Sequence, residues 1–237
     1  MKLLAIDTST ERMSLALQVQ DQRWSHDGAG GQQSSASLIP AILALLAQAG
    51  TALQQLDAIA FGQGPGAFTG LRSACAVAQG LALGANLPLL PIDSLLCVAE
   101  AACPRGQRGQ RVLSVMDARM GQVYAAAYAW EGQAWRIVQA PSLTTAAALA
   151  WPLVWHGQAI VLAGNAAQSH AAGLQHLVDA GADMQMQWPT ATAMLRLAAL
   201  AWQRGEAVSP ELAAPVYVRD QVALTAAERA ALKAASA

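Results

Sequence analysis

The chain has 237 residues, of which 54% are apolar and 12% are charged, and its formal net charge is -1. A chain of this length can bury a substantial core as one large domain or as two smaller lobes. The near-neutral charge argues against a non-specific nucleic-acid binder, because such proteins depend on a strongly basic surface. We expect any contact with RNA to be held mainly by another protein.

The three cysteines, Cys75, Cys97 and Cys103, predict free thiols in a reducing compartment. Their spacings of 22 and 6 residues fit no metal-binding framework, and any disulfide scheme would leave one of them over. The first apolar run is too short for the core of a signal peptide. The longest apolar stretches, residues 38–47 and 74–92, are interrupted by proline or polar residues, so neither is a continuous membrane span. We therefore expect a cytoplasmic protein without a membrane segment.

The first half of the chain predicts three strands followed by alternating helices and strands. The first strand ends at Asp7, and a polar connection leads into the second. The first helix has its apolar residues at i, i+4, i+7 and i+8, which is one helical face: Leu38, Ile42, Leu45 and Leu46. The hydrophobic pattern predicts strands over residues 2–6, 13–20, 23–26, 56–62 and 87–92, and helices over residues 35–50, 70–86 and 94–102.

The second half of the chain repeats the beginning of the first. A strand ends at Asp117 and the next begins six residues later, as the second strand of the first half begins six residues after Asp7. In both halves a polar turn and a tryptophan follow. Residues 159–165 then match residues 58–64 as a strand that enters a glycine-containing turn. We interpret this pattern as a duplication with a period of about 110 residues, which is too long for a solenoid repeat.

Each half predicts a lobe of the form β-β-β-α-β-α, with an antiparallel hairpin followed by parallel strands. We place the first lobe at residues 1–108 and the second, smaller or more divergent, at residues 109–237. This arrangement resembles the actin-like ATPase fold (ASKHA, ribonuclease H-like), an α/β fold that sugar kinases, acetate kinases and Hsp70 share. The resemblance implies that a nucleotide could lie between the lobes, near helix N-termini that favour phosphate.

Two loops of the first lobe are candidates for nucleotide contacts. The loop after Asp7 could position a metal or phosphates, or it could be a turn that binds its own backbone, and both interpretations stay open. The loop from Gly62 to Gly70 is neither a Walker A loop nor GxGxxG. It could be an anion-binding nest or a tight connection, with Thr69 as a helix cap. The vestigial nucleotide contacts that we expect are Asp7, Thr8, Gly64, Gly66 and Thr69.

The sequence offers no catalytic or metal-binding motif. No two of the four histidines are spaced i, i+4, and HExxH, GxSxG and Cys/His clusters are absent from the sequence. We expect no bound metal. We expect the four histidines to be exposed or locally satisfied, and they are His26, His156, His170 and His176.

Four stretches carry a family resemblance: "AIDTST", "GPGAFTGLR" followed by "AQGLALG", "MDARMGQVY" and "PVYVRD". With them the chain resembles the TsaB (YeaZ) family of bacterial tRNA-modification proteins, most strongly from Met1 to about Tyr128. In the family's catalytic sister, TsaD, two metal-binding histidines correspond to Ser94 and Val98 of this chain, and neither side chain can replace an imidazole ligand. Gln122 departs from the glutamate that is frequent in the family.

The resemblance implies a non-catalytic subunit, without a cofactor, that pairs with TsaD and the ATPase TsaE. Together they would form threonylcarbamoyladenosine at adenosine 37 of tRNAs that read codons starting with A, and tRNA would be bound only through the complex. The first-lobe helices would form the partner surface, or a homodimer. The side chains expected there are Leu38, Ile42, Leu45, Leu46, Leu71, Cys75, Ala78 and Ala82. The alternatives are an ATP-binding phosphotransferase and an M22-type metallopeptidase homologue.

Overall fold

The computed structural model describes residues 1–31, 34–104 and 109–219. Its first sheet contains five strands in the order β3-β2-β1-β4-β5. The first three strands are antiparallel, and β4 and β5 extend the sheet in parallel with β1. The strands are β1 (Lys2–Asp7), β2 (Arg12–Val19), β3 (Gln22–Ala29), β4 (Ala58–Gly64) and β5 (Leu89–Asp93).

The second sheet repeats this topology, with the corresponding order β8-β7-β6-β9-β10. Again three antiparallel strands come first, and β9 and β10 are parallel to β6. The strands are β6 (Arg111–Arg119), β7 (Gln122–Trp130), β8 (Trp135–Thr145), β9 (Val161–Ala163) and β10 (Asp183–Gln185). The prediction of two related lobes with mixed sheets is confirmed, and the actin-like α/β fold with it.

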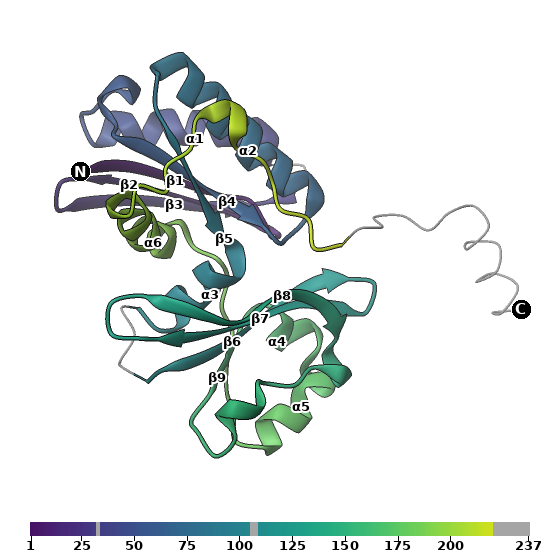
Figure 1. The fold of residues 1–237 in the computed structure, drawn as a ribbon. Coiled ribbons are helices and arrows are strands. Elements are labelled where there is room, and N and C mark those ends of the chain that lie inside the picture. The colour runs from purple at the N-terminus through teal and green to yellow at the C-terminus, as the bar shows by residue number, and fades with distance from the viewer. Residues whose placement is uncertain (32–33, 105–108, 220–237) are drawn as a thin grey trace, which may run out of the picture.

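The helices and sheets form alternating layers (Figure 1). Helices α1 (Ser34–Gln48) and α2 (Phe68–Ala85) cover one face of the first sheet, and α3 (Ser94–Ala102) lies between the two sheets. Helices α4 (Ala166–Ser169) and α5 (Ala171–Asp179) cover the outer face of the second sheet. Short 3-10 turns lie at Leu53–Gln55, Ala146–Ala148, Leu153–Trp155 and Pro210–Leu212. Because helices cover both faces of the first sheet, β1 is apolar on both sides, as is usual for buried parallel strands.

Helix α6 (Ala191–Gln203) requires a correction to the predicted lobe boundary. It packs against β1, β2, β4 and β5, so it covers the second face of the first sheet although it follows the second lobe in sequence. The division into residues 1–108 and 109–237 therefore does not describe where the C-terminal part lies. Periodicity identifies a helix and its apolar face, but it cannot show which sheet that face covers.

The C-terminus of α2 and the N-terminus of α3 show how individual residues determine where a helix ends or begins. Helix α2 ends where Asn86 adopts a left-handed conformation, with φ of 55°, which asparagine tolerates better than most residues. Helix α3 begins after Asp93, whose Oδ1 accepts hydrogen bonds from the backbone N–H groups of Leu95 and Leu96. The other oxygen of Asp93 accepts a 2.7 Å hydrogen bond from Tyr128 of the second lobe.

A buried ion pair joins the middle layer to the helix above it. Glu100 of α3 is buried and pairs with Arg196 of α6, and its second oxygen accepts a 2.8 Å hydrogen bond from the Trp135 indole of β8. Three elements from both lobes therefore meet at one carboxylate. Within the described part of the chain, no helix is long and apolar enough to cross a membrane.

Candidate functional site

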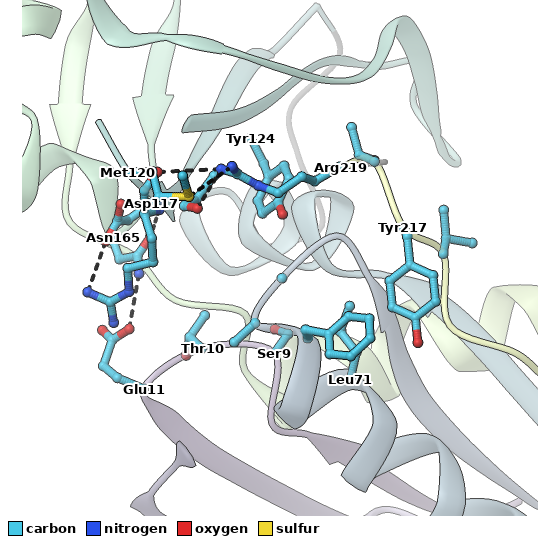
Figure 2. Close-up of a pocket in the computed structure, with 17 residues that line it drawn as sticks. Ser9, Thr10, Glu11, Leu71, Asp117, Met120, Tyr124, Asn165, Tyr217 and Arg219 are labelled. Atoms are coloured by element: carbon cyan, nitrogen blue, oxygen red, sulfur yellow. Dashed lines mark hydrogen bonds and ion pairs between the residues drawn. The ribbon is translucent and has the colours of Figure 1, made fainter. Parts of the chain in front are cut away.

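A cavity of about 260 Å³ opens between the two lobes (Figure 2). One wall comes from the loop after β1 and from the start of α2, and the opposite wall comes from β6, β7 and the turn between them. The segment after the last 3-10 turn closes a third side. The lining residues are Ser9, Thr10, Glu11, Gly66, Ala67, Phe68, Leu71, Asp117, Ala118, Arg119, Met120, Tyr124, Asn165, Val216, Tyr217, Val218 and Arg219.

The loop after β1 folds around the carboxyl group of Asp7, which is buried. Its Oδ1 accepts hydrogen bonds from the backbone N–H of Ser9, at 2.9 Å, and from the Ser9 hydroxyl, at 2.8 Å. Burial raises the pKa of the Asp7 carboxyl from 3.8 to about 6, although the two bonds from Ser9 lower it. Asp7 therefore stabilises a turn, and its side chain is not among those that line the cavity.

The glycine-rich loop packs directly on this turn. The Thr8 hydroxyl donates a 2.6 Å hydrogen bond to the Gly70 carbonyl, and the Ala67 N–H donates a 2.7 Å bond to the Ser9 carbonyl. A Cβ on Gly66 would lie 2.5 Å from the Ser9 carbonyl oxygen, and a Cβ on Gly70 would clash with the Thr8 carbonyl. The glycines are thus needed because two backbones approach each other, and at these contacts the loop binds protein rather than an anion.

The five predicted nucleotide contacts are therefore dispersed. Of the five, Gly66 lines the cavity, whereas Asp7, Thr8 and Gly64 are buried behind it and Thr69 is exposed outside it. Thr69 does not cap the helix either, since α2 begins at Phe68 and the N-cap position is Ala67. Both predicted loops contribute residues to the cavity wall, but the sequence does not distinguish the residues that line the cavity from those used in packing.

The wall from the second lobe is polar. His170 Nε2 lies 3.0 Å from Asp117 Oδ1, and Arg119 pairs with the other oxygen of the same carboxylate at 3.2 Å. The backbone N–H of Asp117 donates a 2.9 Å bond to the Asn165 side chain. His170 has a hydrogen-bond partner, as expected, but the partner is not local: it is 53 residues away in sequence, so no local signal could have identified it.

Hydrogen bonds to Glu11 join the two lobes beside the cavity. Its carboxylate accepts a 3.3 Å bond from the Asn165 amide and a 2.6 Å bond from the Trp188 indole. The neighbouring guanidinium of Arg12 lies 3.7 Å above the Trp188 ring. The first-lobe hairpin turn therefore contacts the turn after β9 and the segment that follows β10.

The segment of residues 214–219, which we call the strap, forms the third side of the cavity. The Val216 N–H donates a 2.7 Å hydrogen bond to the Gln63 carbonyl, and the Tyr217 ring lies 5.1 Å from the Phe68 ring. The Val216 carbonyl oxygen stands 2.5 Å from the place of a Cβ on residue 64, which explains why that position is Gly64. Val216 and Tyr217, from the sequence motif near the C-terminus, therefore pack against the glycine-rich loop and the start of α2.

The structure corrects the predicted partner residues. All eight are exposed by 5% or less. Seven of them belong to the core that α1 and α2 form against the first sheet, and Leu71 lines the cavity between the lobes. An apolar stripe at helical spacing is the face that covers the sheet, so it cannot also face a partner. The eight residues are Leu38, Ile42, Leu45, Leu46, Leu71, Cys75, Ala78 and Ala82.

The opposite faces of α1 and α2 are also apolar at several positions. Ile39 is 46% exposed, Leu43 is 56% exposed, and Leu83 is 57% exposed. None of these three was predicted as a surface residue, because in a helix rich in apolar residues the sequence does not show which of them are exposed. Their exposure on two neighbouring helices leaves an apolar surface without a partner in the described part of the chain.

The two positions that correspond to metal-binding histidines in the catalytic sister are both buried. Ser94 begins α3, and Val98 packs in the core between α3 and the second sheet. Among the described residues, no three His, Cys, Asp or Glu side chains are grouped so as to hold a metal ion.

Comparisons with known proteins agree with the resemblance seen in the sequence. The family model described as "TsaD: tRNA N6-adenosine threonylcarbamoyltransferase" matches residues 15–227. A protein of Escherichia coli K12 named tRNA threonylcarbamoyladenosine biosynthesis protein TsaB is 34% identical, and the match covers 94% of this chain and 96% of that protein. The protein with the same name in Haemophilus influenzae is 43% identical over 52% of this chain and 51% of its own length.

The solved structures give the same result. A crystal structure from Pseudomonas aeruginosa, described as a protein with similarity to peptidase YEAZ, is 36% identical to this chain. It aligns with a TM-score of 0.81 and covers 92% of this chain and 99% of the other. A second structure from that organism, named YeaZ, aligns with a TM-score of 0.80 at the same identity and covers 91% of this chain and 99% of its own.

Proposed function

Because the chain belongs to the TsaB (YeaZ) family, we propose that it is a non-catalytic subunit in the synthesis of threonylcarbamoyladenosine in tRNA. In this proposal a TsaD-type protein transfers the threonylcarbamoyl group to adenosine 37, and a TsaE-type ATPase completes the complex. The chain binds the TsaD-type protein and contacts tRNA only through the complex. The biosynthetic role rests on the names of the relatives, and the structural observations below support the non-catalytic role.

The observation that carries the non-catalytic role is the contact between the two loops of the first lobe. Two donors of these loops that could face a phosphate in an actin-like enzyme are used here within the protein. The Thr8 hydroxyl donates to the Gly70 carbonyl, and the Ala67 N–H donates to the Ser9 carbonyl. Asp7, which ends the first strand, has no access to the cavity. A helix N-terminus binds anions through free N–H groups. Because the Thr8 hydroxyl and the Ala67 N–H are already bonded within the protein, this contact supports packing better than catalysis.

The outward faces of α1 and α2 are the proposed docking surface, which we call the helical face and define by Ile39, Leu43 and Leu83. Large exposed apolar side chains gathered on one surface are typical of protein interfaces. Two helices can pack against two helices of a partner by placing such residues in the grooves between turns. The same surface would also serve a homodimer, because a two-fold interface brings one patch against itself.

The proposal is tested by removing the protein and measuring modified nucleosides in tRNA. We expect threonylcarbamoyladenosine to disappear on depletion and to return when the wild-type chain is supplied. Unchanged levels of this nucleoside after depletion would exclude the pathway.

The docking surface is tested separately with Leu43→Glu, since a buried charge opposes association. This variant should not restore the nucleoside and should not co-purify with the TsaD-type protein. The matched control is Leu153→Glu, which places the same charge at an exposed leucine of the second lobe. If Leu43→Glu binds its partner as well as the control does, the helical face is not the interface.

The inter-lobe cavity supports a second candidate, an ATP-binding protein of the actin-like class. Its volume of about 260 Å³ and the aromatic side chains of Phe68, Tyr124 and Tyr217 are compatible with a small organic ligand. Calorimetric titration with ATP and Mg²⁺ distinguishes the two candidates. Binding tighter than about 10 μM, or roughly 7 kcal/mol, with turnover that is lost in Asp7→Ala, would favour the ATP-binding enzyme over the subunit.

A further inference from the structure

The strap follows α2 before it reaches the second lobe. Just ahead of it, the Gln79 amide of α2 donates hydrogen bonds to the carbonyls of Pro210 and Ala213 at 2.9 and 3.1 Å. The Tyr217 hydroxyl then accepts a 3.1 Å bond from Arg72, at the start of the same helix. The chain therefore runs back along α2 from its middle to its N-terminal turn.

The last described residue of the strap, Arg219, contacts the second lobe. The Arg219 guanidinium donates a 2.9 Å hydrogen bond to the Ala118 carbonyl and a weaker one, at 3.5 Å, to the Arg119 carbonyl. It also contacts the Met120 sulfur at 3.4 Å. All three residues lie at the turn between β6 and β7, which forms the opposite wall of the cavity (Figure 2). Within the described residues, Arg219 bonds to backbone and sulfur atoms and pairs with no carboxylate.

We propose that the strap is a latch that holds the two lobes at their angle around the cavity. Its first part is fixed to the first lobe through Val216 and Tyr217, and its end is fixed to the second lobe through Arg219. Helix α3 lies between the two sheets and packs on both lobes, so it is the pivot about which they would turn. The strap lines one side of the cavity and reaches from the first lobe to the second, so a rotation about α3 would strain its contacts.

The contacts that attach the strap to the two lobes are weak enough to be released. Val216 is 46% exposed and Tyr217 is 42% exposed, so water already reaches the residues that hold the strap to the first lobe. The bonds of Arg219 are made to carbonyl oxygens, which water can replace. By contrast, the bond between Glu100 and Arg196 beside α3 is buried and would persist while the strap detaches. Release of the strap, together with the 3.3 Å hydrogen bond from Asn165 to Glu11, would therefore open the cavity without unfolding either lobe.

The test measures the distance between the lobes with and without the strap contacts. Spin labels are attached at Gln54→Cys in the first lobe and Gln158→Cys in the second, both exposed, while the three native cysteines are buried. Double electron–electron resonance then gives the distribution of distances. We expect a single narrow distribution for the doubly labelled chain, and a broader one with longer distances when Arg219→Ala is added.

Two further variants make the result specific. Tyr217→Phe removes only the hydroxyl bonded to Arg72, so it should broaden the distribution less than Arg219→Ala. Arg136→Ala removes an exposed arginine of the second lobe that pairs with Glu131 and has no contact with the strap, and it should leave the distribution unchanged. The proposal is overturned if Arg219→Ala gives the same distribution as Arg136→Ala, or if both broaden it equally. Circular dichroism spectra establish that each variant is folded before the comparison is made.

Discussion

The Thr8 carbonyl oxygen occupies the place that a Cβ of residue 70 would need, while the Thr8 hydroxyl donates a 2.6 Å hydrogen bond to the Gly70 carbonyl. The two backbones are in contact, and no side chain fits between them. The substitution Gly70→Ala should therefore lower the free energy of unfolding by several kcal/mol, at the upper end of single substitutions.

The matched control for this substitution lies in the same helix. A Cβ on Gly80 would have no heavy atom within 4 Å, and alanine is the better helix former by about 0.5–1 kcal/mol. Gly80→Ala should therefore raise the free energy of unfolding slightly. Chemical denaturation of both variants measures the difference, and equal stabilities would contradict the packing role of Gly70.

The Asp7 carboxyl should contribute more to the free energy of unfolding in acid than at neutral pH. The pKa of its carboxyl is about 6 in the folded chain because of burial, against 3.8 when exposed, so the folded state binds the proton more tightly. The stabilising contribution is present below pH 3.8 and is lost as the pH rises to about 6. The full difference amounts to about 3 kcal/mol.

Asp7→Asn isolates this contribution, since asparagine does not titrate. The difference in unfolding free energy between the variant and the wild type should change across pH 4 to 6 and stay constant above it. Asp21→Asn, at an exposed aspartate, controls for the loss of one charge. A parallel pair of stability curves for wild type and Asp7→Asn would show that the Asp7 carboxyl keeps its ordinary pKa.

Two leucines of α1 should separate folding from partner binding. Leu38 is buried in the core under the helix, so Leu38→Ala should cost about 2–5 kcal/mol of stability. Leu43 lies on the outward face, so Leu43→Ala should change stability by less than about 0.5 kcal/mol but weaken binding of the partner. Thermal unfolding and a pull-down with the TsaD-type protein measure the two effects. Loss of stability in Leu43→Ala would count against the assignment of the two faces.

The buried pair of Glu100 and Arg196 should contribute far more than its exposed counterpart. Arg196→Ala leaves the Glu100 carboxylate buried without its cation and should destabilise the chain by about 3–5 kcal/mol. Arg136→Ala breaks the exposed pair with Glu131 and should cost less than about 1 kcal/mol. Urea denaturation of the two variants provides the comparison. Similar losses from both would mean that burial adds little to this pair.

Much of the fold could be predicted from periodicity alone. Strand alternation, the two aspartates at strand ends and the repeated glycine turns are local signals, and they indicated two lobes of one topology. The short strand β10 and the position of α6 could not be predicted, because both depend on which sheet a segment meets. A helix with an apolar face can pack on any sheet whose apolar face is not yet buried.

The candidate site was predicted less well than the fold, and for a related reason. Asp7 and the glycine loop were recognised by residue type, yet Asp7 binds Ser9, and the two loops bind each other through Thr8 and Gly70 and through Ser9 and Ala67. Ser9 and Thr10, which follow Asp7 in the same loop and line the cavity, were not among the expected nucleotide contacts. The contacts of Asp117 with His170 and of Gly64 with Val216 join residues that are far apart in sequence, so only tertiary structure brings them together.

The position of α6 also has a consequence for how the chain is made. The first sheet is complete once β5 has been synthesised at Asp93, but the helix that covers its second face begins only at Ala191. At about 5–20 residues per second, a ribosome leaves that apolar face uncovered for roughly 5 to 20 seconds. The lobe that emerges first is therefore finished last, and chains arrested before α6 should be cleaved by protease in the first lobe. During that interval the exposed apolar face makes the nascent chain more prone to aggregation than the folded protein.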